Sequence, residues 1–239
     1  MTDVPVLVRE DAHWEIIFRP SSFEPTLIKT LSECKKVVED SRITLRGWDY
    51  PSFNPQNLIR GNDYIGCWDE FHHHREYWRF FQSGQFFHLL AFRENWYKDR
   101  FERQASKAFR RIPEDYEPSG YIDFVSTILT LTEIALFASN VAARTPFPVD
   151  GSVQFRVSMR GMKNRVLTSW DVSRDLWDFY HTPNDNIRWE SNIAVSELLA
   201  DPKTLALDAA QHFFERFGWD NPPEQVFRGD QQKFLERRL

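Results

Sequence analysis

Two neighbouring segments rich in aromatic residues constrain the fold of this chain more than any other feature. Residues 76–82 and 85–93 are separated by Ser83 and Gly84. A short glycine-containing turn between two such runs is typical of a β-hairpin. Strand alternation then predicts two apolar faces, one with Trp78, Phe80, Phe87 and Leu89 and one with Tyr77, Phe81, Phe86 and Leu90. A hairpin that is apolar on both faces belongs near the centre of a covered sheet.

The aromatic content supports a sheet-rich core. The 239 residues include 21 Phe, 9 Trp and 7 Tyr. Large rings bury much area each and favour strands. The length suits one large domain, or two small ones, and is sufficient for a substantial core without disulfides or metals. The alternative use of so many rings is a surface on which bases or sugars stack.

The rest of the chain divides into strand-like and helix-like segments. Strands are expected at 13–19, 42–48, 63–70, 152–159, 165–170 and 187–195, with 152–159 and 165–170 forming a second hairpin. Helices are expected at 26–39 with Thr26 as N-cap, at 94–111, at 121–143, at 202–217 after the N-cap Asp201, and at 225–239. This order predicts a single α+β domain over 1–239, a mostly antiparallel β-sheet built from hairpins with helices packed on it. A subdomain boundary, if there is one, is expected near 145–150.

Cellular location is predicted from three features. Residues 121–143 are largely apolar but include Asp123 and Glu133, and charges are costly inside a lone membrane span. We therefore expect a buried helix and no membrane span. The first ten residues do not resemble a signal peptide. Cys34 and Cys67 are the only cysteines and form no CxxC pair, so reduced thiols in the cytoplasm are expected.

A run of histidines is the first candidate site. His72, His73 and His74 follow Asp69 and Glu70. Histidines and carboxylates are ligands of Zn²⁺, Mn²⁺ and Fe²⁺, but a site needs at least three that converge. In a strand, His72 and His74 share one face and His73 points away. A third ligand would have to come from a distant residue, and the alternative is a polar strand end, so we expect no metal and no cofactor.

A basic segment is the second candidate site. If residues 96–111 form a helix, cations three or four residues apart make one positive stripe, namely Arg100, Arg103, Lys107 and Arg110. Such a stripe binds phosphates, an anionic surface or an acidic protein. The alternative is a solvated face. The net charge of −5 disfavours a dedicated nucleic-acid-binding protein without excluding a local patch.

The hexapeptide RGWDYP, residues 46–51, is the third candidate site. Arg46, Trp48 and Asp49 sit at an expected strand end, where an Arg and an Asp can form a site, and the alternative is a structural corner. Together with EYWRFFQSGQF and ERFGW further along, the hexapeptide resembles a family of uncharacterised bacterial proteins. The resemblance spans most of the chain and implies a bacterial origin, but it brings no activity, cofactor or site residues.

No known catalytic or nucleotide-binding motif is present. The sequence has no GxSxG, no GxxxxGK[ST] and no GxGxxG. This favours a non-enzymatic binding or regulatory protein that acts through a protein partner or self-association. Two alternatives stay open: a nucleic-acid-binding protein that uses the basic helix at 96–111, and a metal-dependent hydrolase that uses the histidines at 72–74.

Overall fold

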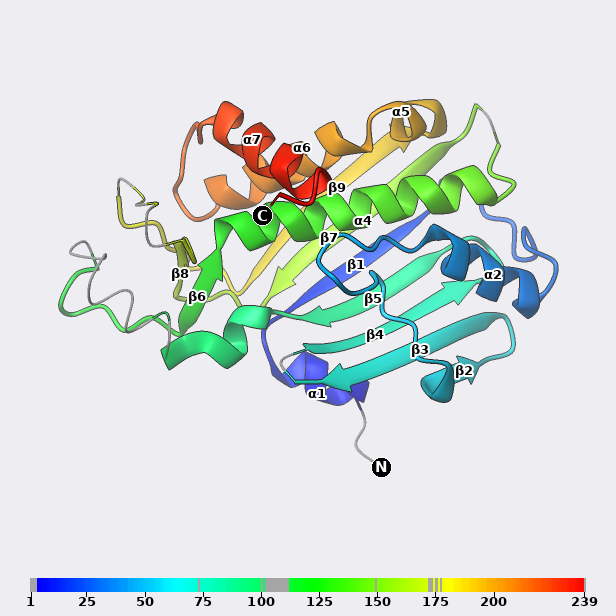
Figure 1. Cartoon of the computed structure of the whole chain (residues 1–239), viewed down its shortest axis with the longest axis horizontal. Helices are drawn as coiled ribbons and strands as arrows, with labels where there is room; N and C mark the ends of the chain where they lie inside the picture. Colours follow the sequence, from blue (N-terminus) through cyan, green and yellow to red (C-terminus); the bar gives the residue numbers. More distant parts are fainter. Residues whose placement is uncertain are drawn as a thin grey trace.

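An antiparallel sheet of seven strands forms the centre of the fold (Figure 1). The structure is a computed structural model that describes residues 4–72, 74–99, 101, 112–148, 150–171, 174, 176 and 178–238. Every neighbouring pair of strands is antiparallel, and strands from both sides of the 145–150 connection share the sheet. The order is β2 (Leu58–Arg60), β3 (Tyr64–Phe71), β4 (His74–Phe81), β5 (Phe86–Ala91), β1 (His13–Pro20), β7 (Ser152–Arg160) and β9 (Asn186–Ala194).

Helices cover one face of this sheet. The long α4 (Phe124–Arg144) lies along it and contacts four other helices. Figure 1 shows α2 (Leu31–Ser41) on one side of α4 and, on the other, α5 (Val195–Ala200), α6 (Pro202–Glu215) and α7 (Glu224–Leu235). On the opposite face, α1 (Val4–Glu10) packs against β3, β4 and β5. The expected α+β fold, a mostly antiparallel sheet with helices packed on it, is confirmed.

The apolar segment expected at 121–143 forms α4 and the short strand before it. Among the described helices, α4 alone has the length and composition needed to cross a membrane, and 72% of its most apolar window is buried inside the structure. Its first turn is capped by Asp123, whose carboxylate accepts a hydrogen bond of 2.7 Å from the Ser126 amide. Burial of this kind is typical of the central helix of a globular core.

The hairpin of β4 and β5 is confirmed, but the predicted faces of β5 are wrong by one residue. Phe80 pairs with Phe86, and Trp78 pairs with His88. A shift of one residue moves every side chain of a strand to the other face. Phe86, His88 and Leu90 therefore lie on the helix-covered face with Trp78 and Phe80. The opposite face packs with α1 through Tyr77, Phe87 and Leu89.

Two other expected strands differ from the structure. Residues 42–48 form a loop, in which Ile43 makes an isolated bridge with Tyr50. The segment expected to complete a second hairpin is β8 (Arg165–Thr168), which pairs in parallel with β6 (Gly120–Asp123) in a separate two-stranded sheet. β7 instead pairs with β1 and β9. Two 3-10 helices, η1 (Pro55–Asn57) and η2 (Arg93–Tyr97), precede β2 and follow β5.

Replacing Thr30 with alanine is expected to lower the free energy of unfolding by about 1 kcal/mol. The helix predicted from Thr26 starts instead after Thr30, whose hydroxyl accepts a 3.1 Å hydrogen bond from the Glu33 amide. The Glu33 carboxylate accepts a 3.0 Å bond from the Thr30 amide and completes a capping box. Urea denaturation measures the change. Thr26→Ala is the matched control, and equal losses for the two variants would contradict this cap.

Candidate functional site

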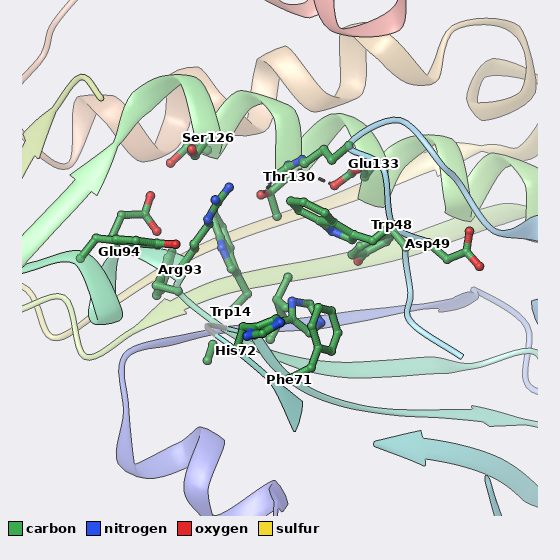
Figure 2. A pocket seen from close by; sticks show the side chains of 18 residues that line it. Trp14, Trp48, Asp49, Phe71, His72, Arg93, Glu94, Ser126, Thr130 and Glu133 are labelled. Atoms are coloured by element: carbon green, nitrogen blue, oxygen red, sulfur yellow. Dashed lines mark hydrogen bonds and ion pairs between the residues drawn. The ribbon is translucent and has the colours of Figure 1, made fainter. Parts of the chain in front are cut away.

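A cavity of about 450 Å³ lies between the helix-covered face of the sheet and the first half of α4 (Figure 2). β1 and β5 form its floor, and the β3–β4 turn, the loop at 46–50 and η2 form its sides. Figure 2 shows Ser126, Thr130 and Glu133 of α4 above Trp14, with Phe71 and His72 below. The lining consists of Trp14, Arg46, Trp48, Asp49, Tyr50, Phe71, His72, His74, Leu90, Ala91, Phe92, Arg93, Glu94, Tyr97, Ser126, Thr127, Thr130 and Glu133.

Aromatic rings form much of the cavity wall. Trp14 of β1 packs on Phe92 with ring centroids 4.9 Å apart. The guanidinium of Arg93 lies 5.7 Å from the ring centre of Trp48 and 5.5 Å from that of Tyr97, and so links the loop to η2 by cation–π contacts. The wall therefore offers flat apolar surfaces to a ligand.

A polar cluster centred on Arg46 lies at the α4 side of the cavity. Nη2 of Arg46 is 3.0 Å from Oε2 of Glu133 and donates a 2.9 Å hydrogen bond to the Thr130 hydroxyl. The side chains of Arg46 and Glu133 are 15% and 3% exposed. Burial raises the pKa of Glu133 to about 7, and the attraction of Arg46 opposes this effect. The pair is held in a place with little access to water.

Two buried polar atoms of this cluster lack a hydrogen-bond partner. They are Nε of Arg46 and Oε1 of Glu133, which belong to residues that line the cavity, whereas Nε2 of His74 faces Oε1 of Glu76 at 3.3 Å. A buried polar atom without a partner costs about 1–3 kcal/mol, and most such atoms in proteins are satisfied. The Arg46–Glu133 pair therefore retains unused hydrogen-bonding capacity within the cavity wall.

A buried carboxylate beneath the cavity organises the neighbouring histidines. Glu76 of β4 accepts a 2.8 Å hydrogen bond from Nε2 of His88, whose Nδ1 lies 3.2 Å from the Tyr50 hydroxyl. Its other oxygen lies 3.3 Å from Nε2 of His74 and accepts a hydrogen bond from the Ser52 amide. Burial acts to raise the pKa of Glu76, but the two imidazoles outweigh it and hold the pKa at about 2.

This carboxylate also controls the charge of His74. Burial acts to lower the pKa of His74, but the nearby Glu76 outweighs it, and the pKa is raised above its usual value of 6.5. The His74 ring stacks on Phe71 at 4.8 Å and is therefore fixed in the cavity wall. The arrangement favours a protonated imidazole that donates hydrogen bonds.

A second buried carboxyl lines the other end of the cavity. Glu94 of η2 is 7% exposed and accepts a 3.2 Å hydrogen bond from the Asp123 amide. Burial raises the pKa of Glu94 to about 7, and the Asp123 carboxylate adds to this rise. Glu94 therefore changes charge near neutral pH.

The residues predicted from RGWDYP all contribute to the cavity lining, with different roles. Arg46 and Trp48 are part of the polar cluster and the aromatic wall. The carboxylate of Asp49 is engaged by Arg42 and accepts a 2.6 Å hydrogen bond from Thr44. Figure 2 shows the Asp49 carboxylate directed away from the other labelled side chains. Asp49 therefore stabilises the loop that carries the other two.

The predicted histidine site is only partly assembled. His72 and His74 both line the cavity, but His72 lies in the turn after β3, with φ of 49°, and not in a strand. The expectation that the two share one strand face is therefore wrong. Within the described residues, which do not include His73, no group of three or more His, Cys, Asp or Glu is placed to hold a metal ion.

The predicted basic stripe lies outside the described residues. Arg100, Arg103, Lys107 and Arg110 are not among them, so the hypotheses that rest on these cations stay predictions. The neighbouring Phe101 is fully buried and stacks on Tyr121 at 5.7 Å.

Glu133 and Glu94 were not identified from the sequence as site residues. A carboxyl in the middle of the apolar segment 121–143 was the signal for Glu133, because an acidic residue is almost never fully buried without a partner. Nothing in the sequence relates Arg46 to Glu133, which are far apart along the chain and meet only through the packing of α4 on the loop.

Comparison of the chain with protein-family models, curated proteins and solved structures gives no significant match. The resemblance to an uncharacterised bacterial family through RGWDYP stays a prediction. The chemistry of the cavity is therefore the best guide to function.

Proposed function

We propose that the protein binds a small, flat organic ligand in the cavity between α4 and the sheet. One observation carries the proposal: an aromatic-walled cavity of about 450 Å³ is also lined by a few charged side chains, among them Arg46, Arg93 and Glu133. Small-molecule sites are typically concave, of about 300–1,000 Å³, mostly apolar and supplied with a few convergent polar groups.

This proposal keeps the expected non-enzymatic binding role and replaces the macromolecular partner with a small molecule. Neither buried cysteine supports nucleophilic chemistry, because burial raises the pKa of Cys34 to about 12 and that of Cys67 to about 11. Arg93 spans the space between Trp48 and Tyr97 and would have to move, or stack on the ligand, when the ligand enters.

Replacing Leu90 with tryptophan is expected to abolish ligand binding. Leu90 lines the cavity and lies between Trp14 of β1 and Glu76 of β4 in the sheet, so a larger ring there fills the cavity from its floor. A panel of nucleosides, aromatic amino acids and monosaccharides is screened by thermal shift and by intrinsic tryptophan fluorescence. At least one compound should bind the unmodified protein saturably and fail to bind Leu90→Trp.

The matched control is Leu199→Trp, because Leu199 is 43% exposed on α5 and does not line the cavity. This variant should bind like the unmodified protein. Circular dichroism and the melting temperature establish that both variants fold. The proposal fails if no compound of the panel binds the unmodified protein, or if the two tryptophan variants bind the same compound equally well.

A further inference from the structure

We propose that the ligand is an aromatic carboxylate, a flat ring that carries one negative charge, and that Arg93 binds its carboxylate group. This inference rests on the proposed binding function and specifies its ligand class. It follows from the exposure of Arg93, its place between two aromatic rings and the pairing of the other charges that line the cavity.

Arg93 is the more exposed of the two arginines that line the cavity. Arg46 is engaged by Glu133 and only 15% of its side chain is exposed, whereas Arg93 is an exposed residue. Within the described part of the chain, Arg93 makes two cation–π contacts and neither an ion pair nor a hydrogen bond. The N–H donors of its guanidinium are therefore available to a ligand.

Accessible aromatic surface lies next to this guanidinium. Its central carbon is 5.7 Å from the ring centre of Trp48 and 5.5 Å from that of Tyr97, and both residues are partly exposed. Phe71, which is 39% exposed, also lines the cavity. Figure 2 shows the Arg93 side chain directed across the cavity towards α4. A ligand group bonded to Arg93 would therefore bring an attached ring against aromatic side chains, on which it can stack.

The unpaired charge of Arg93 favours an anionic ligand. A molecule that fills the cavity while Arg93 stays between the two rings removes water from the guanidinium. This loss raises the free energy unless the molecule brings a charge of opposite sign. A carboxylate meets this requirement well, because its two oxygens match the planar fork of a guanidinium and accept parallel hydrogen bonds. A neutral or cationic ligand would leave Arg93 without a counter-charge.

The other charges of the lining tolerate a single negative charge. Several of them already have a partner of opposite charge, namely Asp49 with Arg42, Glu133 with Arg46 and His74 with Glu76. Burial raises the pKa of Glu94 to about 7, so this carboxyl is only partly ionised at neutral pH. His72 is exposed and repels an anion in neither of its protonation states. A doubly charged phosphate would meet more repulsion from Glu94 and Glu133 than a carboxylate does.

Isothermal titration calorimetry at pH 7 on the unmodified protein tests the inference. Phenylacetate and indole-3-acetate are each compared with the neutral carboxamide of the same ring, phenylacetamide and indole-3-acetamide. At least one carboxylate should bind. Its carboxamide should bind roughly tenfold more weakly or worse, because hydrogen bonds between two charged groups are replaced by weaker ones. The two rings distinguish a ligand with one ring from a ligand with a fused pair.

A variant locates the effect at Arg93. Arg93→Met removes the guanidinium but keeps an unbranched side chain, so the carboxylate should bind roughly tenfold more weakly or worse and lose its advantage over the carboxamide. Arg79→Met is the matched control. Arg79 also lies over two rings, 4.6 Å from the centre of Tyr64 and 5.2 Å from that of Tyr77, but does not line the cavity. This control should keep both the affinity and the preference, and circular dichroism checks that both variants fold.

The inference is overturned if each carboxylate binds no better than its carboxamide, if Arg93→Met keeps the full preference, or if neither carboxylate binds. In the last case, another compound of the panel that binds the unmodified protein but not Leu90→Trp would leave the proposed function standing and remove only the carboxylate assignment.

Discussion

Replacing Glu76 with leucine is expected to lower the free energy of unfolding by about 3–5 kcal/mol, the largest single effect predicted for this protein. Glu76 is 1% exposed and contacts His88, His74 and the Ser52 amide. Leucine fills a similar volume but accepts no hydrogen bond. The Ser52 amide and the two imidazoles are then left buried without their acceptor, and a buried group that loses its partner bears its full desolvation cost.

Urea denaturation at pH 7 measures this loss. Glu70→Leu is the matched control, because Glu70 is on the neighbouring strand and binds Arg75 at 2.8 Å where both side chains are partly exposed. An exposed ion pair contributes about 0–1 kcal/mol, so the control should change little. Similar losses for Glu76→Leu and Glu70→Leu would show that the buried network adds no stability.

The same carboxylate predicts a loss of stability in acid. The pKa of Glu76 is lowered from 4.5 to about 2 in the folded protein, so its contribution is complete above pH 4.5 and is lost as the pH falls toward 2. Glu76→Gln cannot titrate. The difference in stability between the unmodified protein and Glu76→Gln should therefore shrink over this pH range, and a constant difference would contradict the lowered pKa.

The fold class could be predicted because its signals are local. The aromatic hairpin, the apolar segment at 121–143 and the Asp201–Pro202 helix start each depend on neighbouring residues, and each appears in the structure as expected. The register of the hairpin was less predictable. The predicted faces implied a two-residue turn at Ser83 and Gly84. In the structure, β4 ends at Phe81, β5 begins at Phe86, and Gly84 adopts φ of 79°.

The loop at 42–48 was mistaken for a strand for a related reason. Ile43 and Leu45 alternate with polar residues as in a half-buried strand. In the structure, Arg42 and Thr44 both bind the Asp49 carboxylate. Gly47 has φ of 86°, and the chain turns back so that Tyr50 pairs with Ile43. Side-chain bonds to a nearby Asp compete with strand pairing, and alternation alone does not reveal them.

Some residues of the candidate site could be predicted from the sequence, and others could not. The density of residues with special roles in RGWDYP indicated Arg46 and Trp48, since glycine and proline mark a turn there and arginine can form a site at a strand end. Their partners were not identified, because Glu133 and Glu94 come from elements that only tertiary packing brings to the cavity. The rotation of α4 about its own axis decides which of its residues face the sheet, and short-range patterns do not determine it to within one residue.

Replacing Glu94 with glutamine is expected to stabilise the protein by about 2–3 kcal/mol at pH 8 and by little at pH 4. Burial, followed by the Asp123 carboxylate, raises the pKa of Glu94 from 4.5 to about 7, and Arg165 opposes the rise. The folded protein therefore binds a proton that the unfolded chain releases, and stability falls as the pH rises from 4.5 to 7. Glutamine keeps the acceptor for the Asp123 amide without this penalty.

Denaturation at a series of pH values tests the prediction. The gain from Glu94→Gln should grow between pH 4.5 and 7 and stay constant above pH 7, when the carboxyl is ionised in both states. Glu114→Gln, an exposed surface change, should alter stability by less than about 0.5 kcal/mol. A gain in the free energy of unfolding that does not depend on pH would show that ionisation of Glu94 does not destabilise the folded protein. A gain with the predicted pH dependence would show that the ionised Glu94 carboxylate destabilises the fold at the end of the cavity opposite Arg46.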